Sequence, residues 1–246
     1  MENITIQYCF TLANGIKKII DLKLDTKNLD LIISNQDPLP SWTNLDFQKC
    51  PNCILNTKTH KYCPLAVNLA AIVKEFEDLI SYDQVHLDVI TRERTVSQNT
   101  TAQKGISSLM GLVMATSGCP FTAFFKPMAR FHLPLANENE TIYRSTSMYL
   151  LAQFFLKNDG KDADFKLEGL KKIYENLQII NTAIVKRLSA GTKTDSSLNA
   201  IVLLDLFARA LPLVIEDSLE KIRYLFTPFL LTNLSLEKNK GQGQNN

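Results

Sequence analysis

The chain contains 246 residues, of which 45% are hydrophobic and 21% are charged. This composition is typical of globular proteins and excludes the collagen-like, disulfide-scaffold and disordered classes. The 27 Lys and Arg residues nearly balance the 25 Asp and Glu residues, which leaves a net charge of +2. Such a small charge gives no field that would attract nucleic acid or an anionic membrane, so we expect neither as a partner.

The cysteine content and the N-terminus predict a cytoplasmic protein. Five cysteines are an odd number, and no charged and apolar leader with a cleavage site precedes Ile4. The longest apolar stretch, 198–215, contains Asp205, Arg209 and Pro212. Because a charge near the centre of a bilayer costs about 2.5–3.5 kcal/mol, we expect a buried helix in which Asp205 and Arg209 pair one turn apart.

Alternating apolar and polar residues in the first 25 positions predict a β-hairpin that turns at Asn14-Gly15, a favoured pair for tight turns. A third strand is expected over 29–34. A fourth is expected from Val85 through Arg94, where Val85, Leu87 and Val89 alternate with polar residues. Together these segments predict a small antiparallel sheet.

The apolar spacing becomes helical in the rest of the chain. A helix is predicted to begin at Cys63-Pro64, because proline suits the first helical position, and to pack across the sheet. From about Thr100 onward, successive helical stripes predict a bundle. We expect an α+β region over 1–98, a helical bundle over 99–236 and a disordered tail over 237–246, as two domains or as one.

The densest group of metal-ligand residues is the sequence Cys50-Pro-Asn-Cys53, followed after six residues by His60-Lys-Tyr-Cys63. Thiolates and an imidazole are the ligands that tetrahedral zinc prefers, and four protein ligands close the coordination shell. This pattern predicts a structural zinc site at Cys50, Cys53, His60 and Cys63 that clamps the loop between the sheet and the helix.

Other interpretations of the same cysteines stay open. Cys50, Cys53, Cys63 and Cys119 could supply the four thiolates of an iron–sulfur cluster, although the spacing matches neither common ferredoxin pattern. Cys50 and Cys53 could form a redox pair, or the cysteines could be ordinary reduced thiols in a loop.

The segment 119–134 combines four phenylalanines with basic residues. These side chains, together with Arg144, could line a pocket for an anionic or aromatic ligand; the candidate residues are Cys119, Phe124, Lys126, Arg130, His132 and Arg144. Alternatively, the phenylalanines fill a packed core and the cations reach solvent. A thiol enzyme with Cys119 as the nucleophile and His132 as the base is a further alternative, as is zinc catalysis with three of the four cluster residues as ligands.

The Cys-Pro-x-Cys…His-x-x-Cys-Pro cluster and the Ser-Gly-Cys-Pro segment at 117–120 resemble those of a family of uncharacterised bacterial proteins. The resemblance extends from the cysteine cluster to the last helix. It implies a bacterial, cytoplasmic setting and assigns no activity or catalytic residue.

These observations predict a small antiparallel sheet with one packed helix and a metal-clamped loop, followed by a C-terminal helical bundle. The function predicted is that of an intracellular binding or regulatory protein stabilised by zinc, with a small molecule or another protein as its partner. The alternatives are a metal- or thiol-dependent enzyme and an iron–sulfur protein.

Overall fold

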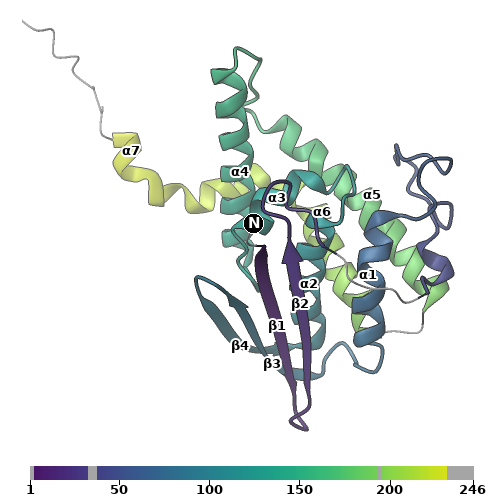
Figure 1. Ribbon diagram of the computed structural model, residues 1–246. Coiled ribbons are helices and arrows are strands. Elements are labelled where there is room, and N and C mark those ends of the chain that lie inside the picture. The colour runs from purple at the N-terminus through teal and green to yellow at the C-terminus, as the bar shows by residue number, and fades with distance from the viewer. Residues whose placement is uncertain (1–2, 33–37, 193–194, 232–246) are drawn as a thin grey trace, which may run out of the picture.

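The computed structural model describes residues 3–32, 38–192 and 195–231 (Figure 1). Within these ranges the strands are β1 (Ile4–Leu12), β2 (Lys17–Leu24), β3 (Gln84–Thr91) and β4 (Thr95–Thr101). They form one antiparallel sheet in the order β2-β1-β3-β4. With helices following toward the C-terminus, the architecture is α+β, as the sequence predicted.

The predicted N-terminal hairpin is confirmed. β1 and β2 pair in antiparallel register, with Tyr8 opposite Ile20. Gly15 has a φ of +82°, a conformation that glycine adopts without steric cost, and the Ile16 amide donates to Asn14 Oδ1 at 3.0 Å. The apolar face of β1, with Tyr8 and Phe10 fully buried, lies against the helices.

Two strand predictions need correction. Residues 29–32 contribute a single bridge, Leu31 to Leu24, in place of a third strand, and residues 33 and 34 lie outside the described ranges. The predicted fourth strand ends at Thr91, and β4 follows it in a segment for which no strand was predicted. β4 is an edge strand with mostly exposed side chains, so its sequence lacks the apolar alternation that marks a half-buried strand.

The described helices are α1 (Pro64–Glu75), α2 (Ala102–Thr116), α3 (Lys126–Arg130), α4 (Glu138–Asn158), α5 (Glu168–Gly191), α6 (Asp195–Ile222) and α7 (Thr227–Leu231), with 3₁₀ turns η1 (Ser41–Thr43), η2 (Ala123–Phe125) and η3 (Arg223–Phe226). α1 begins at Pro64 with Cys63 at its N-cap, as predicted. α6 continues through Pro212, and Arg209 Nε lies 2.6 Å from Asp205 Oδ2, which confirms the expected pair.

Beyond Ile222, the chain extends away from the rest of the molecule as η3 and α7 (Figure 1). None of the described helices is by itself long and apolar enough to span a bilayer, although the bent pair Asp195–Pro212 and Asp217–Leu231 passes a test of length and composition. The predicted tail, 237–246, lies outside the described residues.

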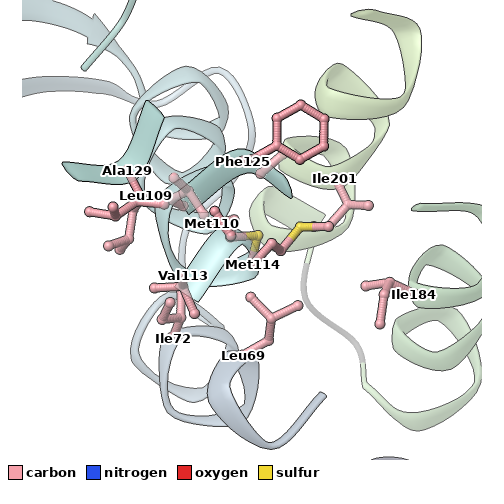
Figure 2. Packing of buried hydrophobic residues seen from close by; sticks show 14 of the residues in the cluster. Leu69, Ile72, Leu109, Met110, Val113, Met114, Phe125, Ala129, Ile184 and Ile201 are labelled. Carbon is pink, nitrogen blue, oxygen red and sulfur yellow. The ribbon is translucent and has the colours of Figure 1, made fainter. Parts of the chain in front are cut away.

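The core is organised around α2, which is buried on nearly all sides. Leu109, Met110, Val113 and Met114 of this helix pack among side chains from α1, η2, α3 and α6 (Figure 2). Against the sheet, a Cβ added at Gly105 would lie 2.6 Å from a ring carbon of Phe10, so this contact requires glycine. The boundary expected between residues 98 and 99 lies inside β4, and one hydrophobic cluster joins the two sides of it.

A buried arginine joins α5 to the loop that precedes the cysteines. Arg187 is 1% exposed, and its Nη1 donates to the carbonyls of Trp42 and Asn44 at 2.8 and 2.7 Å. Its Nη2 donates to the carbonyl of Leu45 at 2.9 Å. The same carbonyl-bearing loop is tied to the start of α1 by the Cys63 amide, which donates to Thr43 at 2.8 Å. The guanidinium of Arg187 therefore holds the segment that precedes the cysteine cluster.

Replacing Arg187 with Met should destabilise the protein strongly, because three carbonyls, two buried and one partly buried, would lose a charged donor. Hydrogen bonds to charged groups contribute about 1.5–3 kcal/mol each, so we expect a total loss of at least about 3 kcal/mol in the free energy of unfolding. Chemical denaturation measures this loss. Arg223→Met, which removes a 60%-exposed arginine, is the matched control and should change stability by less than about 0.5 kcal/mol. Equal stability of the two variants would contradict the clamp.

Candidate functional site

A cavity of about 760 Å³ lies along α2, between this helix and the segments that follow it. Its walls come from the ends of β3 and β4, from α2, from η2 and α3 with the loop after α3, and from α4, α5 and α6. This volume falls within the range of roughly 300–1,000 Å³ that is usual for small-molecule sites. The cavity is therefore large enough to hold an organic ligand.

One face of α2 runs the length of the cavity. Lys104, Ser108, Gly111 and Ala115 all line it at helical spacing. Lys104, at the N-terminal end, is exposed to solvent, whereas Ala115, at the other end, is buried. The cavity thus leads from the surface near β4 into the helical part of the protein.

Two lining residues carry buried polar atoms without a protein partner. Asn181 of α5 is 0% exposed, and neither its Nδ2 nor its Oδ1 forms a hydrogen bond. Near the other end of the cavity, the hydroxyl of Thr101 is also buried without a partner. An unpaired buried amide costs about 1–3 kcal/mol, so the protein carries Asn181 at a penalty that nothing in its own described structure offsets.

A hydrogen-bonded chain crosses from the sheet to the cavity wall. The Leu135 amide donates to Ser108 Oγ at 3.2 Å, Ser108 Oγ lies 3.1 Å from Tyr8 Oη, and Tyr8 Oη lies 2.5 Å from His132 Nε2. Burial lowers the pKa of His132 to about 3, with a smaller effect from the nearby Arg144 charge. The imidazole is therefore neutral near pH 7, and a neutral ring can accept a hydrogen bond from the Tyr8 hydroxyl at Nε2.

Arg144 of α4 is the half-buried cation of the cavity wall. Its Nη2 donates to the carbonyls of Met128 and Phe131 at 2.9 Å each, which fixes the end of α3. No described residue accepts a hydrogen bond from its Nε or Nη1, and none forms an ion pair with it. Burial lowers the pKa of Arg144 from its ordinary value, although a guanidinium remains charged at neutral pH.

The cavity is electrostatically one-sided. Lys104 and Arg144 are its lining cations, and no Asp or Glu is among the described residues that line it. Leu177, Phe207 and Tyr174 give the cavity apolar and aromatic walls, and burial raises the pKa of Tyr174 to about 12. An apolar enclosure whose lining charges are positive favours ligands that carry apolar and acidic parts.

Of the six residues predicted to line a pocket, the structure places two in the cavity wall and four outside it. His132 and Arg144 line the cavity. Phe124 is 54% exposed, Arg130 is exposed beside the ring of Phe131, and Lys126 pairs with Asp30 at 2.7 Å, so these three lie outside it. Cys119 is partly buried and is also absent from the lining.

Cys119 and His132 have different neighbours. Burial raises the pKa of the Cys119 thiol, and its surroundings include Thr122 and Cys63. His132 instead contacts Tyr8, at a ring-centroid separation of 5.9 Å. No described hydrogen bond joins the Cys119 sulfur to the His132 ring, so the structure provides no thiolate–imidazole pair.

The prediction of a structural zinc site is wrong. Among the described residues, no three His, Cys, Asp or Glu side chains form a group that could hold a metal ion. This finding covers the set Cys50, Cys53, His60 and Cys63 and also the four cysteines of the iron–sulfur alternative. His60 is exposed, and its Nδ1 lies 2.9 Å from the hydroxyl of the preceding Thr59. Correct ligand types at workable spacing therefore did not bring four donors together.

The cysteines are nevertheless neighbours in the loop. Burial, with smaller contributions from the nearby thiols of Cys63, Cys119 and Cys53, raises the pKa of Cys50 to about 12. The described cysteines are all free. At neutral pH Cys50 is a neutral thiol, which suits a buried packing role better than reactivity.

Sequence reasoning missed Asn181 and Arg187, although both interrupt an apolar helical stripe. Leu177, Asn181, Ile184 and Leu188 follow helical spacing, and Arg187 lies next to this stripe, so two polar residues occupy core positions of α5. A polar residue at a core position needs a buried partner, which is the signal that could have identified both. Tyr8 gave no such signal, because its apolar ring suits the buried face of β1.

The comparisons with known proteins give a family and no activity. A family model described as Domain of unknown function (DUF6901) matches residues 6–227. No curated protein and no solved structure matches the chain.

The low pKa of His132 predicts that acid destabilises the protein. Below about pH 6.5 the unfolded state binds a proton at His132 that the folded state does not, so stability is complete above pH 6.5 and falls as the pH drops toward 3. Between pH 7.5 and pH 5 the loss should be up to about 2 kcal/mol. Urea denaturation of His132→Gln should show a shallower dependence over this range. His60→Gln, at an exposed position, should keep the wild-type dependence; a wild-type profile in His132→Gln would refute the assignment.

Proposed function

The chain belongs to the DUF6901 family, and from the geometry of its cavity we propose that it is a binding protein for a small organic molecule. The ligand occupies the cavity along α2, between the end of the sheet and helices α4 to α6. The observation that carries this function is the unpaired, fully buried amide of Asn181 in the cavity wall.

Asn181 supports binding because the two sides of its amide require two different partners. Its Nδ2 is a donor and its Oδ1 is an acceptor, and within the described protein neither is satisfied. The ligand hydrogen-bonds this amide and removes the penalty. Residues that sacrifice stability in the ligand-free protein in this way are typical of binding sites.

Replacing Asn181 with Leu should stabilise the ligand-free protein, because the change removes two unpaired polar atoms at a buried position of similar size. We expect the free energy of unfolding to rise by about 1–3 kcal/mol. The matched control is Asn176→Leu on the same helix. Asn176 accepts from Asn52 at 2.7 Å and donates to Lys172 at 2.9 Å, so this variant should be destabilised. Destabilisation of both variants would show that the Asn181 amide already has a partner, such as a buried water.

The cavity itself is tested with the neutral fluorophore N-phenyl-1-naphthylamine, whose emission increases in an apolar site. The protein should bind the fluorophore, and Gly111→Leu should weaken binding at least about tenfold by filling the cavity. At Gly111 an added Cβ would lie 3.6 Å from Leu204, an ordinary contact, so this variant should fold.

Ser147→Leu is the control for the fluorophore experiment, because it adds the same side chain at an exposed position of α4. It should bind the fluorophore like the wild type. Equal binding by Gly111→Leu and the wild type would place the fluorophore elsewhere and would contradict the proposed function. Circular dichroism and thermal unfolding verify that both variants fold.

A further inference from the structure

We propose that the ligand is an amphipathic monoanion, an aliphatic or aromatic chain with one acidic group, and that Arg144 binds the acid. This inference rests on the proposed function, because it names the class of molecule that the same cavity holds. The inference assigns the acidic group of the ligand to Arg144, whereas Asn181 hydrogen-bonds a different part of the ligand.

Arg144 has the donors that an acid group requires. Its Nη2 is used by the carbonyls of Met128 and Phe131, which fixes the position of the guanidinium in the wall. Its Nε and Nη1 have no described acceptor, and no described carboxylate forms an ion pair with the group. The charge of Glu140, one turn earlier in α4, acts on this guanidinium but forms no described ion pair with it. The Nε and Nη1 donors therefore remain available to an acid, and charge-assisted hydrogen bonds to them are stronger than neutral ones.

The other lining residues favour a ligand with a negative charge. No Asp or Glu is among the described lining residues, although the charge of Glu140 acts on Arg144 from outside the lining. His132 beside Arg144 is neutral near pH 7, because burial lowers its pKa to about 3. Lys104 adds a second positive charge at the solvent-exposed end. The charged residues that line the site, Lys104 and Arg144, therefore both attract an anion.

The apolar walls favour a ligand whose remaining part is an elongated apolar chain. The face of α2 from Lys104 to Ala115 spans about 16 Å at 1.5 Å per residue, so the cavity suits an elongated molecule. Leu177, Leu203 and Phe207 line the side formed by α5 and α6. Burial of a chain against these side chains supplies affinity, and the single acid fixes its orientation.

The test compares three probes with the same chain and different charge: dodecanoate, 1-dodecanol and dodecyltrimethylammonium. Each is titrated into the full-length protein below its micellar concentration, by displacement of N-phenyl-1-naphthylamine. We expect dodecanoate to bind at least about tenfold more tightly than either of the other two probes. The wild-type comparison requires no variant, so it does not depend on whether a substituted protein folds.

The outcomes distinguish failure of the anionic ligand class from failure of the proposed binding function. If dodecanol displaces the fluorophore as well as dodecanoate does, the cavity binds apolar molecules and the anionic class is wrong. Tightest binding of dodecyltrimethylammonium also overturns the anionic class. If neither the fluorophore nor any of the three probes binds, the proposed function itself fails.

Variants test whether Arg144 is the residue that binds the acidic group of the ligand. Arg144→Leu should lose the preference of dodecanoate over dodecanol, whereas Arg130→Leu, at an exposed position on α3, should keep it. Since Arg144 also holds the end of α3, Arg144→Lys serves as a second variant that retains the charge and should retain part of the preference. Loss of the preference in Lys104→Leu, with none in Arg144→Leu, would overturn the assignment to Arg144.

Discussion

The structure depends on the buried guanidinium of Arg187. It donates to the carbonyls of Trp42, Asn44 and Leu45, and so it fixes the loop before the cysteines onto the end of α5. Gly191, one turn further on, lets the ring of Trp42 approach the same helix, since a Cβ there would lie 2.6 Å from the Trp42 side chain. The orientation of α5 is thereby set, and the preceding turns of this helix carry Tyr174 and Asn181 to the cavity.

Helix α2 contributes both to the core and to the cavity wall, and its two sides differ in how closely they are packed. One side is closely packed, to the point that Gly105 has no room for a side chain beside Phe10. The other side lines an open volume of about 760 Å³ in which Asn181 has no protein partner. Close packing stabilises a fold, whereas an open wall with an unpaired amide lowers its stability.

The cysteine loop shows why residue types and spacing did not suffice to predict a metal centre. A tetrahedral site needs four donors that converge within about 2.0–2.3 Å of one point, and sequence spacing only permits this convergence. Here Cys63 occupies the N-cap of α1 and His60 lies exposed on a turn, so the loop places these donors apart. Main-chain hydrogen bonds join the end of this loop to the segment at residues 43–45, and Arg187 holds that segment; neither contact depends on thiolate chemistry.

The sequence by itself determined those elements whose cause is local. Asn14-Gly15 determined the hairpin, Pro64 determined the start of α1, and apolar stripes determined the long helices of an α+β fold. The sequence also singled out His132 and Arg144, which line the cavity, but it grouped them with residues that lie outside it.

Only the tertiary structure decided which distant residues meet. The sequence did not predict β4, because an edge strand needs no apolar alternation. Tyr8 and Arg187 bond to His132 and Trp42, which lie more than a hundred residues away along the chain. The cavity has contributions from both ends of α2 and from helices α4 to α6, so no local pattern could reveal it. Local propensities follow from neighbouring residues, whereas the site is a product of packing among segments that the chain connects only at long range.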